Sequence, residues 1–145
     1  MKYSDWIIPR LRDLEQERAA LQNIPERIRT LELAFAGLRA ANTEGDVVSG
    51  GENHREEAML ANIAERDELK RNLVISRREV EQVDGALAKL SQEERLVLDR
   101  FYIHREPGHV ERLCEELIME KSQVYNIKNR ALVKLARMLH GQVYL

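Results

Sequence analysis

The chain is poor in the residues that bend, crosslink or anchor a fold. Its 145 residues include three prolines, seven glycines and one cysteine, and only 5% are aromatic. Because Cys114 is alone, an internal disulfide is excluded. Glycine and proline interrupt helices, so their scarcity predicts long uninterrupted helices. Aromatic residues are few, and 33% of the residues are charged. Both fractions argue against a large hydrophobic core.

Long apolar runs are also missing. No stretch approaches the roughly 18 apolar residues that suggest a transmembrane helix. The N-terminal sequence MKYSDWIIPR lacks the apolar segment of a signal peptide. We therefore expect a cytoplasmic protein that contacts no membrane.

Two segments carry a seven-residue apolar repeat. The first has Leu14, Leu21, Ile24, Ile28, Leu31, Phe35 and Leu38. The second has Leu69, Leu73, Ser76, Val80, Val83, Leu87 and Leu90. This spacing predicts a long antiparallel helical hairpin, or coiled coil, over residues 1–88 with its turn near 41–53. We expect it to form a dimer or higher oligomer.

Pro25 lies inside the first repeat. Proline within a helix removes a backbone hydrogen bond and costs about 3 kcal/mol. Asn23 and Glu26 fit a capping box that could restart the helix. We therefore expect a kink or break near residues 23–25.

After the second repeat, the pattern changes to three shorter helical segments. Ser91 and Glu94 fit a capping box that begins the first of them. We expect a short helix at 110–117, a turn at 118–121 and a longer helix at 122–139. This order is that of a helix-turn-helix, which we place in a C-terminal domain of residues 89–145.

The last segment is basic. From Ile118 to the end, five Lys and Arg residues face one Glu, a net charge of +4. Since the whole chain has a net charge of −2, the rest carries −6. A basic helix on an acidic body suits phosphate binding, although several basic residues on one helix are more often a solvated face.

Several motifs in this part resemble a known family. They are Arg95-Leu96-Val97-Leu98-Asp99-Arg100-Phe101-Tyr102, Leu113-Cys114-Glu115-Glu116-Leu117, Val124-Tyr125-Asn126-Ile127 and Arg130-Ala131-Leu132-Val133-Lys134-Leu135. They are similar to region four of bacterial sigma factors over residues 87–141. The whole layout is similar to the sigma-like phage transcriptional regulators of the ArpU and RinA type. The resemblance implies activation of phage or prophage late genes.

The resemblance also implies which side chains contact DNA. The candidate DNA-binding residues are His109, Lys121, Ser122, Gln123, Tyr125, Asn126, Asn129 and Arg130. Asn126 can pair with adenine, and Lys121 can donate to guanine or to a phosphate. His109 falls where the family often has a hydroxyl residue capping a helix against a phosphate. Lys128 and Lys134 are expected, with Arg130, to meet the DNA backbone or a protein partner.

The chain departs from the family in its turn and at its N-terminus. Ile118 replaces a glycine or small polar residue, and β-branched residues resist positive φ. Glu120 replaces a serine or threonine and is a weaker helix cap, so a differently shaped turn is expected. Nothing in residues 1–86 resembles the region that binds the −10 promoter element. The chain should therefore not act as a primary sigma factor on its own.

Residues that could carry other chemistry have simpler explanations. Cys114 lies on the inward side of a short helix, which favours a core position. The four histidines share no metal-ligand spacing, and no phosphate-loop, hydrolase or zinc-protease motif occurs. Trp6 is expected to anchor packing of the arm. We expect no enzyme activity, no metal and no cofactor.

The leading hypothesis is a sequence-specific transcriptional regulator that reads the major groove of double-stranded DNA with helix 122–139. It would associate with itself through the arm, and RNA polymerase is a further candidate partner. One alternative is the DNA-recognition subunit of a phage packaging machine, of the small-terminase type. Another is a coiled-coil interaction adaptor that does not bind DNA. Apart from the resemblance, the residues are compatible with either activation or repression of transcription.

Overall fold

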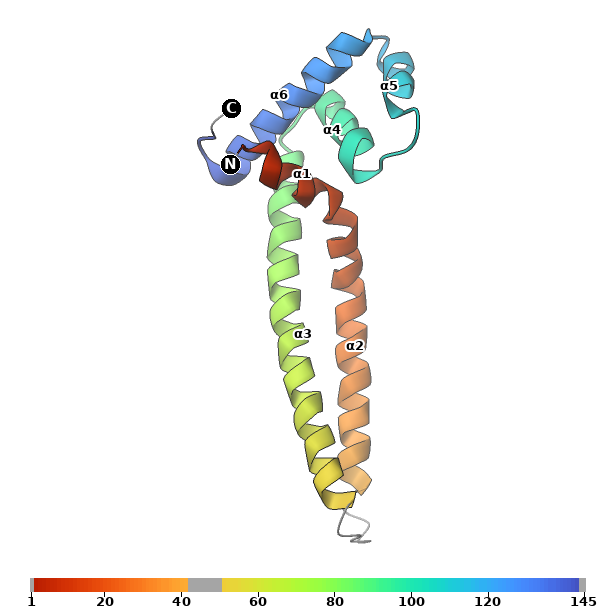
Figure 1. The fold of residues 1–145 in the computed structure, drawn as a ribbon, viewed down its shortest axis with the longest axis vertical. Coiled ribbons are helices and arrows are strands. Elements are labelled where there is room, and N and C mark those ends of the chain that lie inside the picture. The colour runs from red at the N-terminus through yellow and green to blue at the C-terminus, as the bar shows by residue number, and fades with distance from the viewer. Residues whose placement is uncertain (1, 42–50, 144–145) are drawn as a thin grey trace. The chain divides into compact units, whose positions relative to one another are not determined.

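The computed structural model describes residues 2–41 and 51–143, apart from the side chains of residues 51 and 52. Within these ranges every regular element is helical, which confirms the predicted all-α class (Figure 1). The elements are α1 (Ser4–Arg12), α2 (Leu14–Ala41), α3 (Gly51–Leu87), α4 (Gln92–Leu98), the π-helix η1 (Asp99–Ile103), α5 (His109–Leu117) and α6 (Lys121–His140). In this described part, no helix combines the length and apolar character needed to cross a bilayer.

The chain forms two compact units, one of residues 1–17 with 78–145 and the other of residues 18–77. This division differs from the predicted boundary at residue 88. In the first unit α1 packs against η1 and α6, so the N-terminal residues belong with the C-terminal helices. Trp6 was expected to anchor packing of the arm. Its ring centre instead lies 5.0 Å from that of His140 at the end of α6.

The core of the first unit is built mainly from aliphatic side chains. The largest fully buried ones are Ile7, Leu11, Leu14, Val83, Val97, Leu98, Leu113, Val124 and Leu135. Val80, Ala86 and Leu90 are buried as well, so the end of the second heptad repeat contributes to this core. Periodicity identified Val80, Val83 and Leu90 as inward-facing but could not identify what they face.

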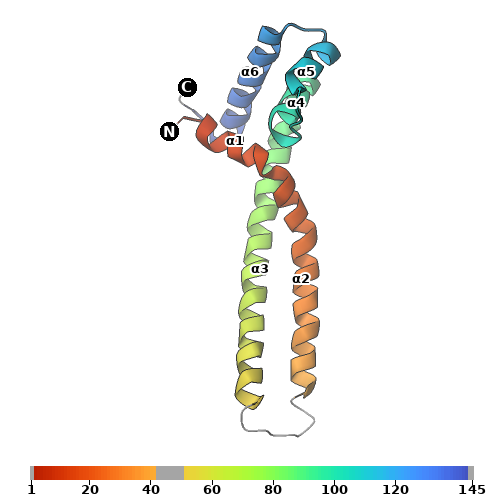
Figure 2. The same cartoon turned by 45° about the vertical axis from the view of Figure 1, so that its right-hand side comes forward.

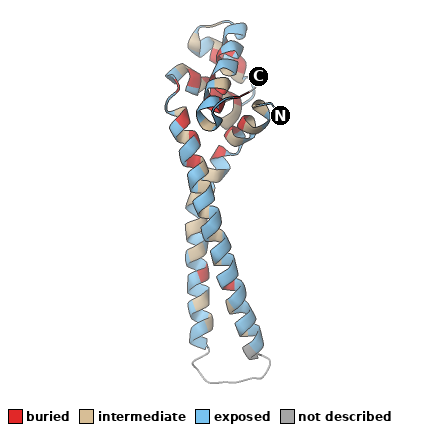
Figure 3. Cartoon of the chain, turned by 90° about the vertical axis from the view of Figure 1, so that its left-hand side faces the viewer, coloured by how far each residue is buried: buried red, intermediate tan, exposed pale blue. Residues whose placement is uncertain are grey.

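The unit of residues 18–77 consists of parts of α2 and α3, which lie side by side (Figures 1 and 2). Most of its described residues are exposed (Figure 3), and Leu31 is the buried apolar side chain among them. Arg27 forms an ion pair with Glu65 at 3.1 Å, and the Arg66 guanidinium lies 4.9 Å from the centre of the Phe35 ring. This unit therefore has little apolar burial of its own.

Asn62 is the buried polar residue of this unit. Its Nδ2 donates to the carbonyl of Leu31 at 2.8 Å, and its Oδ1 accepts from Arg66 Nε at 2.8 Å. Asn62 stands one heptad before Leu69, so it continues the apolar stripe with a polar residue. A buried asparagine in such a stripe costs stability but fixes the register of the two helices.

Pro25 does not break the first long helix. Of the kink or break predicted near residues 23–25, the break is wrong, because α2 is continuous from Leu14 to Ala41. The interruption lies instead at Asp13, between α1 and α2. One missing hydrogen bond is a local cost, whereas the packed stripe on both sides of Pro25 favours one helix.

The predicted turn near 41–53 lies mostly outside the described residues, which omit 42–50. Residues 51–53 are already helical, because α3 begins at Gly51. The turn prediction was therefore too long at its C-terminal end.

The predicted capping box at the start of α4 is confirmed. The Ser91 N–H donates to Glu94 Oε1, and the Glu94 N–H donates to Ser91 Oγ, both at 3.1 Å. Burial alone would raise the pKa of Glu94, but hydrogen bonds from Ser91 and Lys134 outweigh it and lower the pKa. The Lys134 Nζ lies 3.0 Å from Glu94 Oε2. This ion pair joins α6 to the N-terminus of α4.

Replacing Glu17 with Gln should reduce the pH dependence of stability. Burial, together with a hydrogen bond and repulsion from Glu79, raises the pKa of Glu17 from 4.5 to about 7. The folded chain therefore holds this proton more tightly than the unfolded chain. The resulting stabilisation is complete below about pH 4.5 and is lost as the pH rises through about 7.

Urea unfolding at about pH 5 and about pH 8 measures this effect. The loss of stability between the two should be smaller for Glu17→Gln than for the wild type. Glu32→Gln, at an exposed position of α2, is the matched control and should behave as the wild type. An unchanged loss in Glu17→Gln would contradict the assignment.

Candidate nucleic-acid interface

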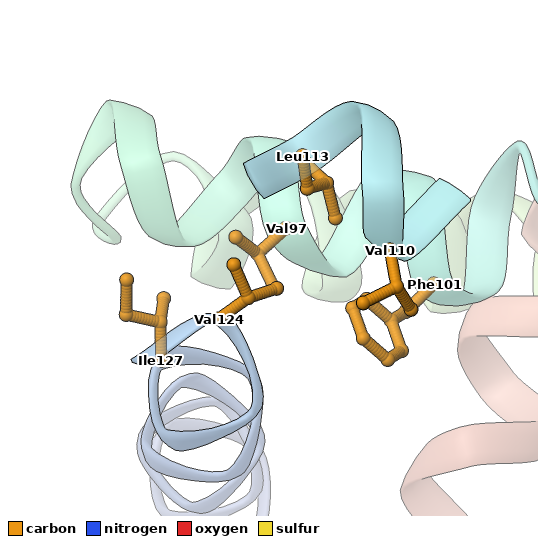
Figure 4. Packing of buried hydrophobic residues seen from close by; sticks show 6 residues of the cluster. All are labelled: Val97, Phe101, Val110, Leu113, Val124 and Ile127. Carbon is orange, nitrogen blue, oxygen red and sulfur yellow. The ribbon is translucent and has the colours of Figure 1, made fainter. Parts of the chain in front are cut away.

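The N-terminal half of α6 is held in place by a hydrophobic cluster shared by four elements. Its members are Val97 of α4, Phe101 of η1, Val110 and Leu113 of α5, and Val124 and Ile127 of α6 (Figure 4). Cys114 packs against this cluster, as its predicted core position requires. Since α5 and α6 share one cluster with α4, the exposed side of α6 is carried on a fixed support.

The chain turns between α5 and α6 at Ile118–Glu120. Ile118 has φ 53° and ψ 55°, and it is the non-glycine residue with positive φ among those described. This left-handed conformation at the end of a helix is usually occupied by glycine, because a branched side chain is strained there. The Met119 N–H donates to the Cys114 carbonyl at 3.1 Å and completes the turn. Ile118 itself is 90% exposed, so its side chain gains little from packing.

The first turn of α6 is capped by one of the predicted DNA-binding residues. The Glu120 N–H donates to Gln123 Oε1 at 3.0 Å. Glutamine at the third helical position commonly reaches back in this way. The oxygen of Gln123 therefore has an intramolecular partner, which leaves its amide group as the donor available to a ligand.

The exposed side of α6 brings most of the other predicted residues together. Ser122, Asn126, Asn129 and Arg130 are exposed and follow one another at intervals of four, three and one. With 3.6 residues per turn, these intervals place them on one face of the helix. Lys121 is exposed in the first turn beside them. The face offers amide, hydroxyl and cationic groups within about three turns of helix.

Tyr125 stands beside this face in an aromatic cluster. Its ring meets that of Phe101 edge to face, with 5.6 Å between ring centres. The Lys128 Nζ lies 5.7 Å from the Phe101 ring centre and 5.5 Å from that of Tyr125. Partial burial lowers the pKa of Lys128. Tyr125 and Lys128 are therefore oriented by Phe101, a partnership that helical periodicity did not reveal.

His109 belongs to the same cluster. Its ring meets the Phe101 ring edge to face at 4.8 Å, and its Nδ1 lies 3.2 Å from the Glu106 carbonyl oxygen. The N-cap of α5 is Gly108, which has φ 74°. His109 is therefore the first residue of α5 and not its cap, which corrects the expected capping position, and its side chain is half-buried.

Two further cations have partners within the chain. Lys134, expected to meet DNA or a protein, forms its ion pair with the buried carboxylate of Glu94. Arg112 pairs with Glu106 at 2.7 Å near the start of α5. The sequence predicted Lys134 to be outward-facing and gave no indication of this ion pair, because Glu94 is forty residues away along the chain.

The described residues hold no group of three or more His, Cys, Asp or Glu side chains that could bind a metal ion. No protein-family model, curated protein or solved structure matches the chain. The function of the chain is therefore inferred from its side chains and their geometry.

Replacing Ile118 with Gly should stabilise the chain. Glycine tolerates positive φ, so the substitution should relieve strain and raise the free energy of unfolding by about 0.5 to 1 kcal/mol. Urea denaturation measures the change. Gly108→Ala is the opposite control, because an added Cβ there meets nothing within 4 Å and adds only backbone strain. The Gly108→Ala variant should have a lower free energy of unfolding than the wild type. A lower free energy of unfolding for Ile118→Gly would refute the strain assigned to Ile118.

Proposed function

We propose that the chain is a sequence-specific DNA-binding regulator of transcription, in which α5, the turn and α6 act as a helix-turn-helix. In this proposal α6 enters the major groove, and parts of α2 and α3 form a coiled-coil hairpin arm. The observation that carries the proposal is the exposed face of Ser122, Asn126, Asn129 and Arg130 on a helix fixed by a buried cluster. A rigid helix with polar groups on one face suits base recognition.

The side chains of this face have the chemistry for direct readout. Asparagine can pair with the N6 and N7 atoms of adenine, and lysine can donate to the acceptors of guanine. Asn126 is exposed near the N-terminus of α6, the part of a recognition helix that contacts base edges, and Lys121 beside it can reach a phosphate. Tyr125, fixed against Phe101, can present its ring edge to a thymine methyl group and its hydroxyl to a phosphate.

Fewer cationic residues of the last segment are available for phosphate contacts than its net charge of +4 suggests. Lys134 has an intramolecular partner, and Lys128 is half-buried over two rings. Lys121, Arg130 and Arg137 remain exposed, and of these Lys121 and Arg130 lie on or beside the polar face in the N-terminal half of α6. We therefore propose these two residues as the main phosphate contacts of α6.

The resemblance to region four of sigma factors supports a role in phage or prophage transcription. It is carried by residues that pack inward, since Ala131, Leu132 and Leu135 of the closing motif are buried. It therefore supports the proposed fold of the module more than its contacts. RNA polymerase is proposed as a partner only by this resemblance.

Replacing Asn126 with Ala should weaken binding to a selected site and relax its specificity. A duplex selected from a random library by the wild-type protein serves as the probe. Loss of one bidentate contact should cost about 1 to 3 kcal/mol on that duplex, with a smaller change on random duplex. Fluorescence anisotropy on both probes measures the difference. Equal affinity of wild type and variant for the selected duplex would exclude base reading by Asn126.

Replacing Lys121 or Arg130 with Ala should weaken binding to every duplex and lower the salt dependence of binding. Each lost phosphate contact should reduce the slope of log K against log salt concentration by about 1. Lys89→Ala is the matched control. Lys89 is exposed and lines a hollow with Met138 and Leu139, at the other end of α6. Equal slopes in all four proteins would contradict the proposed phosphate contacts.

A further inference from the structure

The heptad stripes of the unit of residues 18–77 are occupied within the chain. Leu31 of α2 accepts a hydrogen bond from Asn62 of α3, and both residues are buried. Leu69 and Leu73 continue the Asn62 stripe and are half-buried. These stripes are therefore not free to bind a second chain, although the sequence pattern suggested an oligomer through the arm.

Large apolar side chains also lie on the opposite side of α3. Leu60, Ile63, Val74 and Ile75 are 67%, 39%, 53% and 53% exposed. At 3.6 residues per turn they fall within a sector of about 120°, centred opposite the Asn62 stripe. We call these four residues the outer face of α3. Val74 and Ile75 line a shallow hollow together with the aliphatic parts of Lys70 and Arg71.

The charges along this side of α3 change sign near its middle. Glu56, Glu57 and Asp67 are exposed in the first half, whereas Lys70, Arg71 and Arg78 are exposed in the second half, which ends with Glu81. A second α3 in the parallel direction would set like charges against each other. An antiparallel one sets the acidic half of one helix against the mainly basic half of the other, and charged residues beside a helix seam select orientation in this way.

We infer that the outer face of α3 binds a second copy of this chain with the two α3 helices antiparallel. The two-fold axis lies between Asp67 and Lys70, so that Leu60 and Ile63 of one copy contact Val74 and Ile75 of the other. Asp67 of each copy then lies beside Lys70 of the other. Such an interface is self-complementary, as a two-fold dimer requires, and it covers apolar side chains that the single chain leaves exposed.

The mass of the full chain in solution, measured without DNA by sedimentation velocity over a concentration series, tests this interface. The wild type should have twice the 16.9 kDa mass of one chain. Leu60→Glu and Ile75→Glu should each weaken the dimer at least tenfold. Leu33→Glu is the matched control, because Leu33 is 69% exposed but lies on α2. Circular dichroism of each variant checks that the helices are retained.

A monomeric wild type, or a dimer unaffected by Leu60→Glu and Ile75→Glu, would overturn the inference. Equal weakening by Leu33→Glu would also overturn the assignment to this face. Because no DNA is present, these outcomes are independent of whether the proposed DNA binding is correct.

Cross-linking tests the orientation with milder substitutions. In a Cys114→Ala background, which removes the one native cysteine, Leu60→Cys and Ile75→Cys proteins are mixed with a short bis-maleimide. The antiparallel pair should cross-link Leu60→Cys to Ile75→Cys, whereas two copies of Leu60→Cys lie about 24 Å apart along the helix and should not react. Asp67→Cys should cross-link to itself. Efficient self-reaction of Leu60→Cys without the mixed product would overturn the antiparallel arrangement.

Discussion

The packing around Phe101 is the constraint on which the candidate interface depends. Its ring contacts those of His109 and Tyr125 edge to face, and the Lys128 amine lies above it. Aromatic rings favour this geometry because the positive edge of one meets the negative face of another. A single buried side chain of η1 thereby orients groups from both α5 and α6. The direction in which α6 presents its polar face follows from this contact.

The connection between α5 and α6 shows a conformational cost and a compensating hydrogen bond. Ile118 takes a left-handed conformation that its branched side chain disfavours, while Gln123 satisfies the N–H of Glu120. The two helices are joined by few residues, so the shared cluster beneath them dictates the turn. Local strain persists where surrounding packing over-determines the backbone, and such positions often mark functional sites.

The candidate site could be predicted from sequence as far as its exposed positions. Periodicity placed Asn126, Asn129 and Arg130 outward, because three or four residues make one turn and apolar neighbours mark the buried side. It could not show that Lys134 pairs with Glu94. An outward position on a helix says nothing about whether a distant segment approaches it. Charge counting therefore overstated the number of cations available to a ligand.

The sequence by itself determined the all-helical class, the approximate bounds of α5 and α6, and the cap at Ser91, because these follow from spacing and local hydrogen bonding. Only the tertiary structure decided that α2 continues through Pro25 and that α1 packs with α6. Both depend on burial gained between residues far apart in the chain. An apolar stripe specifies that a helix needs a partner, and three-dimensional packing decides which one.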